Sequence, residues 1–226
     1  MEYKIHGTTL QTLDIILEHG ESVFTESGGM AWMTGNITME TNTRGGVLKG
    51  LARTFAGESM FLTTYACEGK KALVTFTPES PGSIIPIILG PNESRICQKD
   101  AFMVAEQTVN LEVHFRKKLG AGIFGGEGFI LQKLTGPGIA FVEIAGDVRT
   151  YELAEGQTLK VDPGHIAMYE PSISYDISRV SGVKNILFSG EGLFLATLTG
   201  PGRVWLQSLP LSNLAAKLAT YIPSKG

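Results

Sequence analysis

The chain has 226 residues, of which 43% are hydrophobic and 18% are charged. A chain of this length buries enough surface to fold without disulfides or a metal, and its apolar content argues against disorder. Lys and Arg number 19 against 22 Asp and Glu, which gives a formal net charge of −3. The balance argues against a nucleic-acid partner, because such binders usually need an excess of positive charge.

The cysteines and the N-terminus point to the cytoplasm. Cys67 and Cys97 are the two cysteines of the chain, and their spacing is not that of a disulfide framework or a CxxC motif. The first ten residues, MEYKIHGTTL, are polar and unlike a secretory signal. The apolar stretch at Ile84–Leu89 is too short to span a bilayer.

Taken in chain order, the apolar residues mostly recur with period two, which is typical of β-strands. Ile37 and Met39 alternate with polar residues, Ala72–Phe76 is apolar on both faces, and Ile173–Ile177 alternates again. Helical spacing is found at Val47–Phe55 and at Leu211–Tyr221. Turn signals recur between the short strands, so we predict an all-β sandwich or barrel with a short C-terminal helix.

The sequence also repeats itself. GEGFILQKLTGPG at 126–138 and GEGLFLATLTGPG at 190–202 are identical at most positions, and GESMFLTTYACEG at 57–69 is a weaker copy. A polar turn precedes a short apolar strand upstream of each copy, in EHGESVF, GPNESRI and AEGQTLK. We therefore predict a single domain, 1–226, of three repeats at about 1–79, 80–148 and 149–226, in a pseudo-threefold arrangement.

These segments carry a family resemblance. LGAGIFGGEGFILQKLTGPG at 119–138, GGVLKGLARTFAGESMF at 45–61 and the copy at 190–202 resemble the altered-inheritance-of-mitochondria protein 24 family. The resemblance implies a β-sandwich of repeats similar to the tryptophan RNA-binding attenuation protein and related to the double-stranded β-helix. Mitochondrial relatives are associated with inner-membrane organisation, which implies a membrane-peripheral role, and the family provides no catalytic motif.

Each repeat copy begins with a glutamate, and these three residues are candidate site residues. Glu58, Glu127 and Glu191 could form a ring of carboxylates that holds a cation. Alternatively, each carboxylate accepts backbone N–H groups in its own glycine-rich turn, and we favour this structural role. The GxGxxG at 120–125 precedes a strand rather than a helix, so we do not interpret it as a dinucleotide-binding loop.

The sequence contains no motif for catalysis or for a resident cofactor. The four histidines include no His-x-His pair, and His165 is interpreted as a residue at a turn or strand edge. GxSxG and HExxH are also missing from the sequence. We therefore expect no metal, no cofactor and no enzymatic activity.

The apolar, glycine-rich loop at 119–125 is a candidate contact surface. Ile123 and Phe124 either mediate self-association, touch a membrane, or cap the core. The first hypothesis is a non-enzymatic, cytoplasmic scaffold or binding protein that forms homo-oligomers, with a membrane surface or a protein as further partner. The alternative is a small-molecule-binding module that uses a cavity between its sheets.

Overall fold

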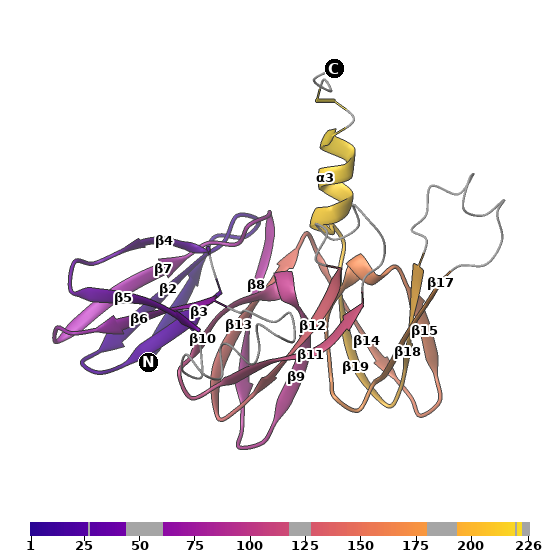
Figure 1. Cartoon of the computed structure of the whole chain (residues 1–226), viewed down its shortest axis with the longest axis horizontal. Coiled ribbons are helices and arrows are strands. Elements are labelled where there is room, and N and C mark those ends of the chain that lie inside the picture. Colours follow the sequence, from indigo (N-terminus) through magenta and orange to yellow (C-terminus); the bar gives the residue numbers. More distant parts are fainter. Residues whose placement is uncertain (27, 44–60, 118–127, 180–193, 220, 223–226) are drawn as a thin grey trace.

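A computed structural model describes residues 1–26, 28–43, 61–117, 128–179, 194–219 and 221–222. Almost all of the regular structure in these residues is β-strand, arranged in four sheets (Figure 1). Within these ranges, the α-helix α3 (Leu211–Ala219) follows the last strand, and the 3-10 turns η1 (Lys99–Ala101) and η3 (Pro163–His165) precede strands. The prediction of an all-β protein with a short C-terminal helix is thus confirmed.

The two outer sheets are small. In spatial order, the first sheet contains β1 (Glu2–His6), β2 (Thr12–Glu18), β7 (Lys71–Phe76) and β4 (Met30–Met33). The fourth sheet contains β15 (Thr158–Val161), β18 (Phe194–Thr199) and β17 (Ser174–Arg179).

The two middle sheets have six strands each. The second sheet contains β5 (Ile37–Thr43), β6 (Phe61–Cys67), β3 (Ser22–Thr25), β10 (Phe102–Glu106), β13 (Gly138–Ala145) and β8 (Gly82–Leu89). The third contains β11 (Asn110–Lys117), β12 (Phe129–Thr135), β9 (Ser94–Gln98), β16 (Ile166–Tyr169), β19 (Gly202–Gln207) and β14 (Val148–Leu153). None of the sheets formed by the described strands closes on itself, so the sandwich alternative holds.

Three hydrophobic cores separate the four sheets. Side chains of the first and second sheets form one core, those of the second and third a middle core, and those of the third and fourth a last core. Strand β13 shows why both middle sheets are apolar: Phe141 enters the first core and Val142 enters the middle core. The molecule is therefore a layered stack, and its three sandwiches lie in a row in Figure 1.

The middle sheets also join the sandwiches through backbone hydrogen bonds. In the second sheet, three strands of the first sandwich lie beside three strands of the second. The two sets are joined where β3 pairs with β10, with Phe24 opposite Ala105. In the same way, Cys97 of β9 pairs with Met168 of β16 in the third sheet. We call the strand sets β2–β7, β8–β13 and β14–β19 the first, second and third units.

The polar turns predicted from the sequence are present. In each, a side-chain oxygen caps a backbone N–H three residues earlier, which satisfies a donor that the strand does not use. The donors and acceptors are Glu18 N and Glu21 Oε2 (2.9 Å), Gly90 N and Glu93 Oε2 (3.0 Å), and Ala154 N and Gln157 Oε1 (3.0 Å).

The expected C-terminal helix forms, and its described part covers Leu211–Ala219 rather than extending to Tyr221. The helix expected at Val47–Phe55 lies outside the described residues. Cys67 and Cys97 are both buried free thiols, as expected for a chain without disulfides. Burial raises the pKa of the Cys97 thiol to about 12, which keeps it protonated and unreactive.

Candidate functional site

A pocket with both polar and apolar lining residues lies where the second and third units meet beneath α3. Its volume is about 390 Å³, within the range of small-molecule sites. The lining comes from the end of β9, η1, β13, η3, β19, the residue before α3 and the first turns of α3. It consists of Gln98, Asp100, Glu143, Ala145, Gly164, Gln207, Pro210, Leu211, Ser212 and Ala215. These residues are far apart in sequence and are brought together by the stacking of the sheets.

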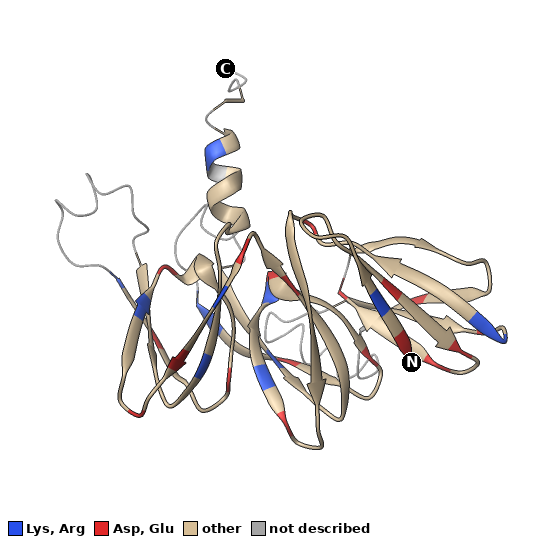
Figure 2. Ribbon diagram, turned by 180° about the vertical axis from the view of Figure 1, so that it is seen from behind, with Lys and Arg blue, Asp and Glu red and all other residues tan. Residues whose placement is uncertain are grey.

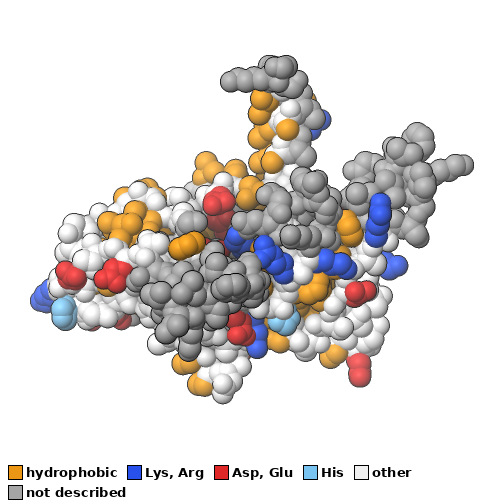
Figure 3. Space-filling view, viewed as in Figure 1, with side chains coloured by type: hydrophobic (Ala, Val, Ile, Leu, Met, Phe, Trp, Pro, Cys, Tyr) orange, Lys and Arg blue, Asp and Glu red, His pale blue; other side chains and the backbone are white. Residues whose placement is uncertain are grey.

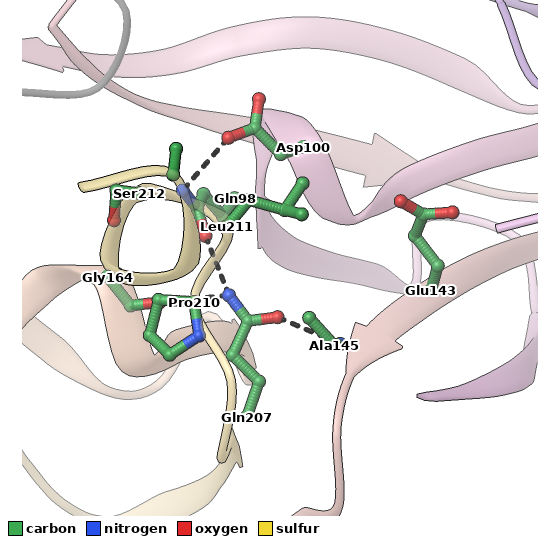
Figure 4. A pocket seen from close by; sticks show the side chains of 10 residues that line it. Gln98, Asp100, Glu143, Ala145, Gly164, Gln207, Pro210, Leu211 and Ser212 are labelled. Atoms are coloured by element: carbon green, nitrogen blue, oxygen red, sulfur yellow. Dashed lines mark hydrogen bonds between the residues drawn. The ribbon is translucent and has the colours of Figure 1, made fainter. Parts of the chain in front are cut away.

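Gln207 organises one wall of the pocket (Figure 4). Its Oε1 accepts a hydrogen bond from Ala145 N at 3.2 Å, while its Nε2 donates to Gly164 O at 2.8 Å and to Gln98 Oε1 at 3.3 Å. Gln98 Nε2 in turn donates to Asp100 Oδ2 at 3.4 Å. The amides are therefore fixed by one another, and the bonds connect the second unit to the third.

Glu143 lies on the opposite wall, on β13, and is only 7% exposed. Its Oε2 accepts a hydrogen bond from the backbone N–H of Glu79 at 3.1 Å. Burial raises the pKa of the Glu143 carboxyl to about 8, the hydrogen bond from Glu79 opposes this rise, and the negative charges of Glu79 and Asp100 add to it. The carboxyl is therefore mostly protonated at neutral pH.

The helix α3 forms the upper side of the pocket and then leaves the body of the molecule. Leu211, Ser212 and Ala215 of its first turns line the pocket. Further along, the helix projects into solvent, and hydrophobic side chains are visible along it in Figure 3. Leu218 is 54% exposed, so the described part of the chain does not bury the apolar face of this helix.

The carboxylates and the apolar pair predicted as site residues lie outside the described residues. This applies to Glu58, Glu127 and Glu191, and to Ile123 and Phe124. Whether the three glutamates converge, and whether the loop touches a partner, therefore stay predictions. Among the described residues, no group of His, Cys, Asp and Glu is arranged to hold a metal ion.

His165 occupies the place expected for it, at the end of η3 and directly before β16. Its Nδ1 lies 2.8 Å from the carbonyl oxygen of Gln207. The turn itself is capped by Asp162, whose Oδ1 accepts a hydrogen bond from Gly164 N at 2.9 Å. His165 therefore supports the backbone behind the pocket rather than entering it.

The residues that line the pocket were not among those predicted from the sequence. One signal was present: Glu143 is a single acid within the otherwise apolar strand Gly138–Ala145. A buried charge is rare unless it is paired or functional, so such a residue is worth examining. The remaining members, Gln98, Asp100 and Gln207, give no sequence signal, because their proximity depends on the stacking of separate sheets.

Charged residues occur in all three units of the described structure. Figure 2 shows Lys, Arg, Asp and Glu along the strands of all three units. None of the described helices has the length and apolar character needed to cross a membrane. The described residues thus define a layered, nearly all-β protein with a small pocket of mixed lining between two of its units.

Comparison with known proteins identifies the family. The family model described as mitochondrial biogenesis AIM24 matches residues 3–209, and the chain belongs to this family. An uncharacterised protein of Streptococcus pyogenes serotype M6 is 31% identical over 220 residues, which cover 94% of this chain and 87% of the relative. The crystal structure of a Streptococcus pyogenes protein is similar with a TM-score of 0.80 and 26% identity, covering 98% of this chain and 99% of the other.

Proposed function

We propose that this protein is a non-enzymatic, cytoplasmic binding protein that self-associates through its C-terminal helix. The observation that carries the proposal is the exposed apolar face of α3. Leu218, Tyr221 and Ile222 are 54%, 74% and 69% exposed, and they lie on or just beyond the projecting helix (Figure 3). Soluble monomers seldom leave neighbouring large apolar side chains in water, whereas subunit contacts bury them.

The occupant that fits this helix best is the same helix of a second copy. Two copies related by a twofold axis present the same surface to each other, so each Leu218 faces apolar groups of its partner. The described part of the helix carries a single charge, Lys217, which lies 5.7 Å from the Tyr221 ring centroid. If the two helices pair in antiparallel orientation, Lys217 of one copy lies far from Lys217 of the other. Like charges then do not oppose each other.

The mass of the assembly tests this proposal. Native mass spectrometry of the wild type should give a multiple of 24.3 kDa, and Leu218→Ser should give the monomer. Asn213→Ser, an exposed polar position on the same helix, serves as the control and should assemble as the wild type does. A monomeric wild type, or a Leu218→Ser variant that still assembles, would contradict the proposal.

The same experiment separates self-association from a peripheral membrane role. An apolar helix that binds lipid should carry the protein into sedimenting vesicles of phosphatidylcholine and phosphatidylserine. If the wild type is monomeric in solution and sediments with vesicles, and Leu218→Ser does not sediment, the partner of α3 is a membrane surface. We expect assembly without vesicle binding.

A second candidate function, small-molecule binding, is favoured by the pocket beneath α3. A volume of about 390 Å³, a fixed amide wall and a buried carboxyl are features of binding sites rather than of packing defects. Native mass spectra of freshly purified protein would reveal a ligand as additional mass that is lost on denaturation. Spectra without additional mass would leave self-association as the function and count against this second candidate.

We also infer that the chain consists of three repeats, 1–79, 80–148 and 149–226. Two features of the described residues support this. The capped polar turns occur before the second strand of each unit. In addition, an irregular step interrupts the pairing of β4, β10 and β16 directly after their first residue pairs. A pseudo-threefold arrangement, and the relation to the double-stranded β-helix and the tryptophan RNA-binding attenuation protein, stay predictions.

A further inference from the structure

Strands β2, β8 and β14 occupy the same place in the three units. Each pairs on one side with the last strand of its unit, β7, β13 or β19, and each is followed by a capped polar turn. We call the opposite side of these strands the outer edge. On β2 the outer edge is covered by β1, which adds an antiparallel strand from the pair Glu2–Ile16 to the pair His6–Thr12.

The outer edge of β8 is closed without a strand. Gly82 N donates to the carbonyl oxygen of Thr9 at 2.7 Å, and Ile84 N donates to Gln11 Oε1 at 2.6 Å. Pro86, the next residue on this edge, has no N–H to offer. Proline is one of the devices that protect an edge strand from pairing with another chain.

The outer edge of β14 has neither form of protection within the described part of the chain. Ser208 N donates to Asp147 O at 3.0 Å, so every second residue of β14 counted from Asp147 turns its backbone groups toward β19. Thr150 and Glu152 therefore turn their N–H and C=O groups to the outer edge. Both residues are exposed, and no described strand pairs with β14 on this side.

The side chains of β14 determine which strand fits beside it, because residues opposed across two strands share a face of the sheet. Arg149 and Glu152 are exposed, and neither takes part in the ion pairs formed among the described residues. Glu152 faces Arg203 across β19, whereas Arg149 faces Leu206. An added strand that complements β14 thus carries an acid opposite Arg149 and a base rather than an acid opposite Glu152.

From these observations we propose that the outer edge of β14 binds an extended segment of a partner protein, which adds an antiparallel strand to the third sheet. The pairing of β1 with β2 is the template, since a strand of five residues occupies the same edge there. Backbone bonds to Thr150 and Glu152 provide affinity, and a carboxylate opposite Arg149 provides selectivity. This surface is separate from the apolar face of α3.

Hydrogen exchange measured by NMR on the isotope-labelled full chain, with the acetylated and amidated peptide Lys-Val-Thr-Glu-Val, tests the proposal. In antiparallel orientation its glutamate lies opposite Arg149 and its lysine opposite Glu152. At saturation, exchange at the N–H groups of Thr150 and Glu152 should slow about tenfold or more, because they become donors. The N–H groups of Arg149 and Tyr151, which face β19, are internal controls and should change little.

Thr150→Pro should close the edge of β14 as Pro86 does on β8. The two positions correspond, because each lies equally far before the donor of its polar turn, Ala154 or Gly90. The N–H of residue 150 points outward, so the substitution removes no bond to β19 and should keep the fold. Peptide binding should weaken about tenfold or more, whereas the control Thr150→Val, which retains the N–H, should bind as the wild type does.

Charge exchange tests the selectivity while every backbone group is kept. The peptide Glu-Val-Thr-Lys-Val, of the same composition, should bind the wild type about fivefold more weakly, because it opposes like charges. Arg149→Glu should weaken binding of Lys-Val-Thr-Glu-Val by a similar factor. The peptide Lys-Val-Thr-Lys-Val should restore the affinity of that variant.

Several outcomes would overturn the proposal. These are unchanged exchange at Thr150 and Glu152 with the peptide present, equal binding of the two charge-exchanged peptides, and undiminished binding by a folded Thr150→Pro variant. Slow exchange at the same groups in the free protein would also overturn it: a second copy occupies the edge if the protection grows with protein concentration, and a segment of the same chain if it does not. Leu218→Ser should bind the peptide normally, so this test is independent of self-association through α3.

Discussion

At the scale of single residues, Glu143 differs most from its surroundings. Its neighbours on β13 are apolar and pack into two cores, yet its own carboxyl is buried beside the pocket. Burial raises the pKa of this carboxyl to about 8, from a usual value near 4.5. The native state consequently holds a proton that the unfolded chain would release at neutral pH, which links this one residue to the stability of the whole protein.

The sign of the resulting pH dependence follows directly. The contribution of Glu143 to stability is fully present below about pH 4.5 and is lost as the pH rises through about 8. The loss is at most roughly 5 kcal/mol, since each pKa unit corresponds to about 1.4 kcal/mol. Urea unfolding should therefore show the wild type losing stability between pH 5 and pH 9, and Glu143→Gln losing less. Parallel profiles for the two proteins would show that this carboxyl titrates normally.

At the scale of elements, strand β13 is central because it contributes side chains to two hydrophobic cores. Period-two patterning alone does not reveal this. Phe141 is fully buried in the first core, where its ring lies 4.9 Å from that of Tyr3, and Val142 is fully buried in the middle core. A strand with both faces buried reads as a continuous apolar run, as this one does. Substitutions in β13 should therefore disturb the packing on both sides of the second sheet.

Phe141→Ala should lower the free energy of unfolding by about 3–5 kcal/mol, because it removes a buried ring and leaves a cavity. Ile88 on the neighbouring strand β8 is 71% exposed, so Ile88→Ala is a matched control that should change stability by about 0.5 kcal/mol or less. Chemical denaturation of both variants measures the difference. A Phe141→Ala protein as stable as the control would show that β13 is not central to the packing.

Prediction from sequence succeeds for these elements where the signal is local. The C-terminal helix is predictable because Leu211, Leu214 and Leu218 recur at helical spacing, and the capped turns because their residues lie within a few positions of each other. The pocket depends on Gln98, Glu143 and Gln207, which meet only after separate units stack. The layered order of the sheets has the same origin, since the pairing of β3 with β10 joins distant segments.

At the scale of the whole molecule, the shared middle sheets link the units. Each of these sheets takes three strands from one unit and three from the next, and each has cores on both faces. A unit that unfolded alone would expose a core and leave a neighbouring sheet with a free edge. The free energy needed to unfold one unit alone is therefore close to that needed to unfold two units together.

We therefore expect a single cooperative unfolding transition. In scanning calorimetry, the calorimetric and van't Hoff enthalpies should agree, and near- and far-ultraviolet circular dichroism should change together. Measuring the 226-residue chain at several scan rates checks that the transition is reversible. Two resolved transitions would mean that the units are independent despite their shared sheets.

The outer faces of the first and fourth sheets determine where the stack ends. On the first sheet, Asp14 accepts a hydrogen bond from Thr75 at 2.6 Å and lies 3.2 Å from His6. On the fourth, Thr197 is flanked by Lys160 and Asp176. A fifth layer would have to dehydrate these groups without replacing their partners. These polar groups disfavour the addition of a further sheet at either end of the stack. Contacts between copies of this protein are therefore expected through other surfaces rather than by continued stacking of sheets.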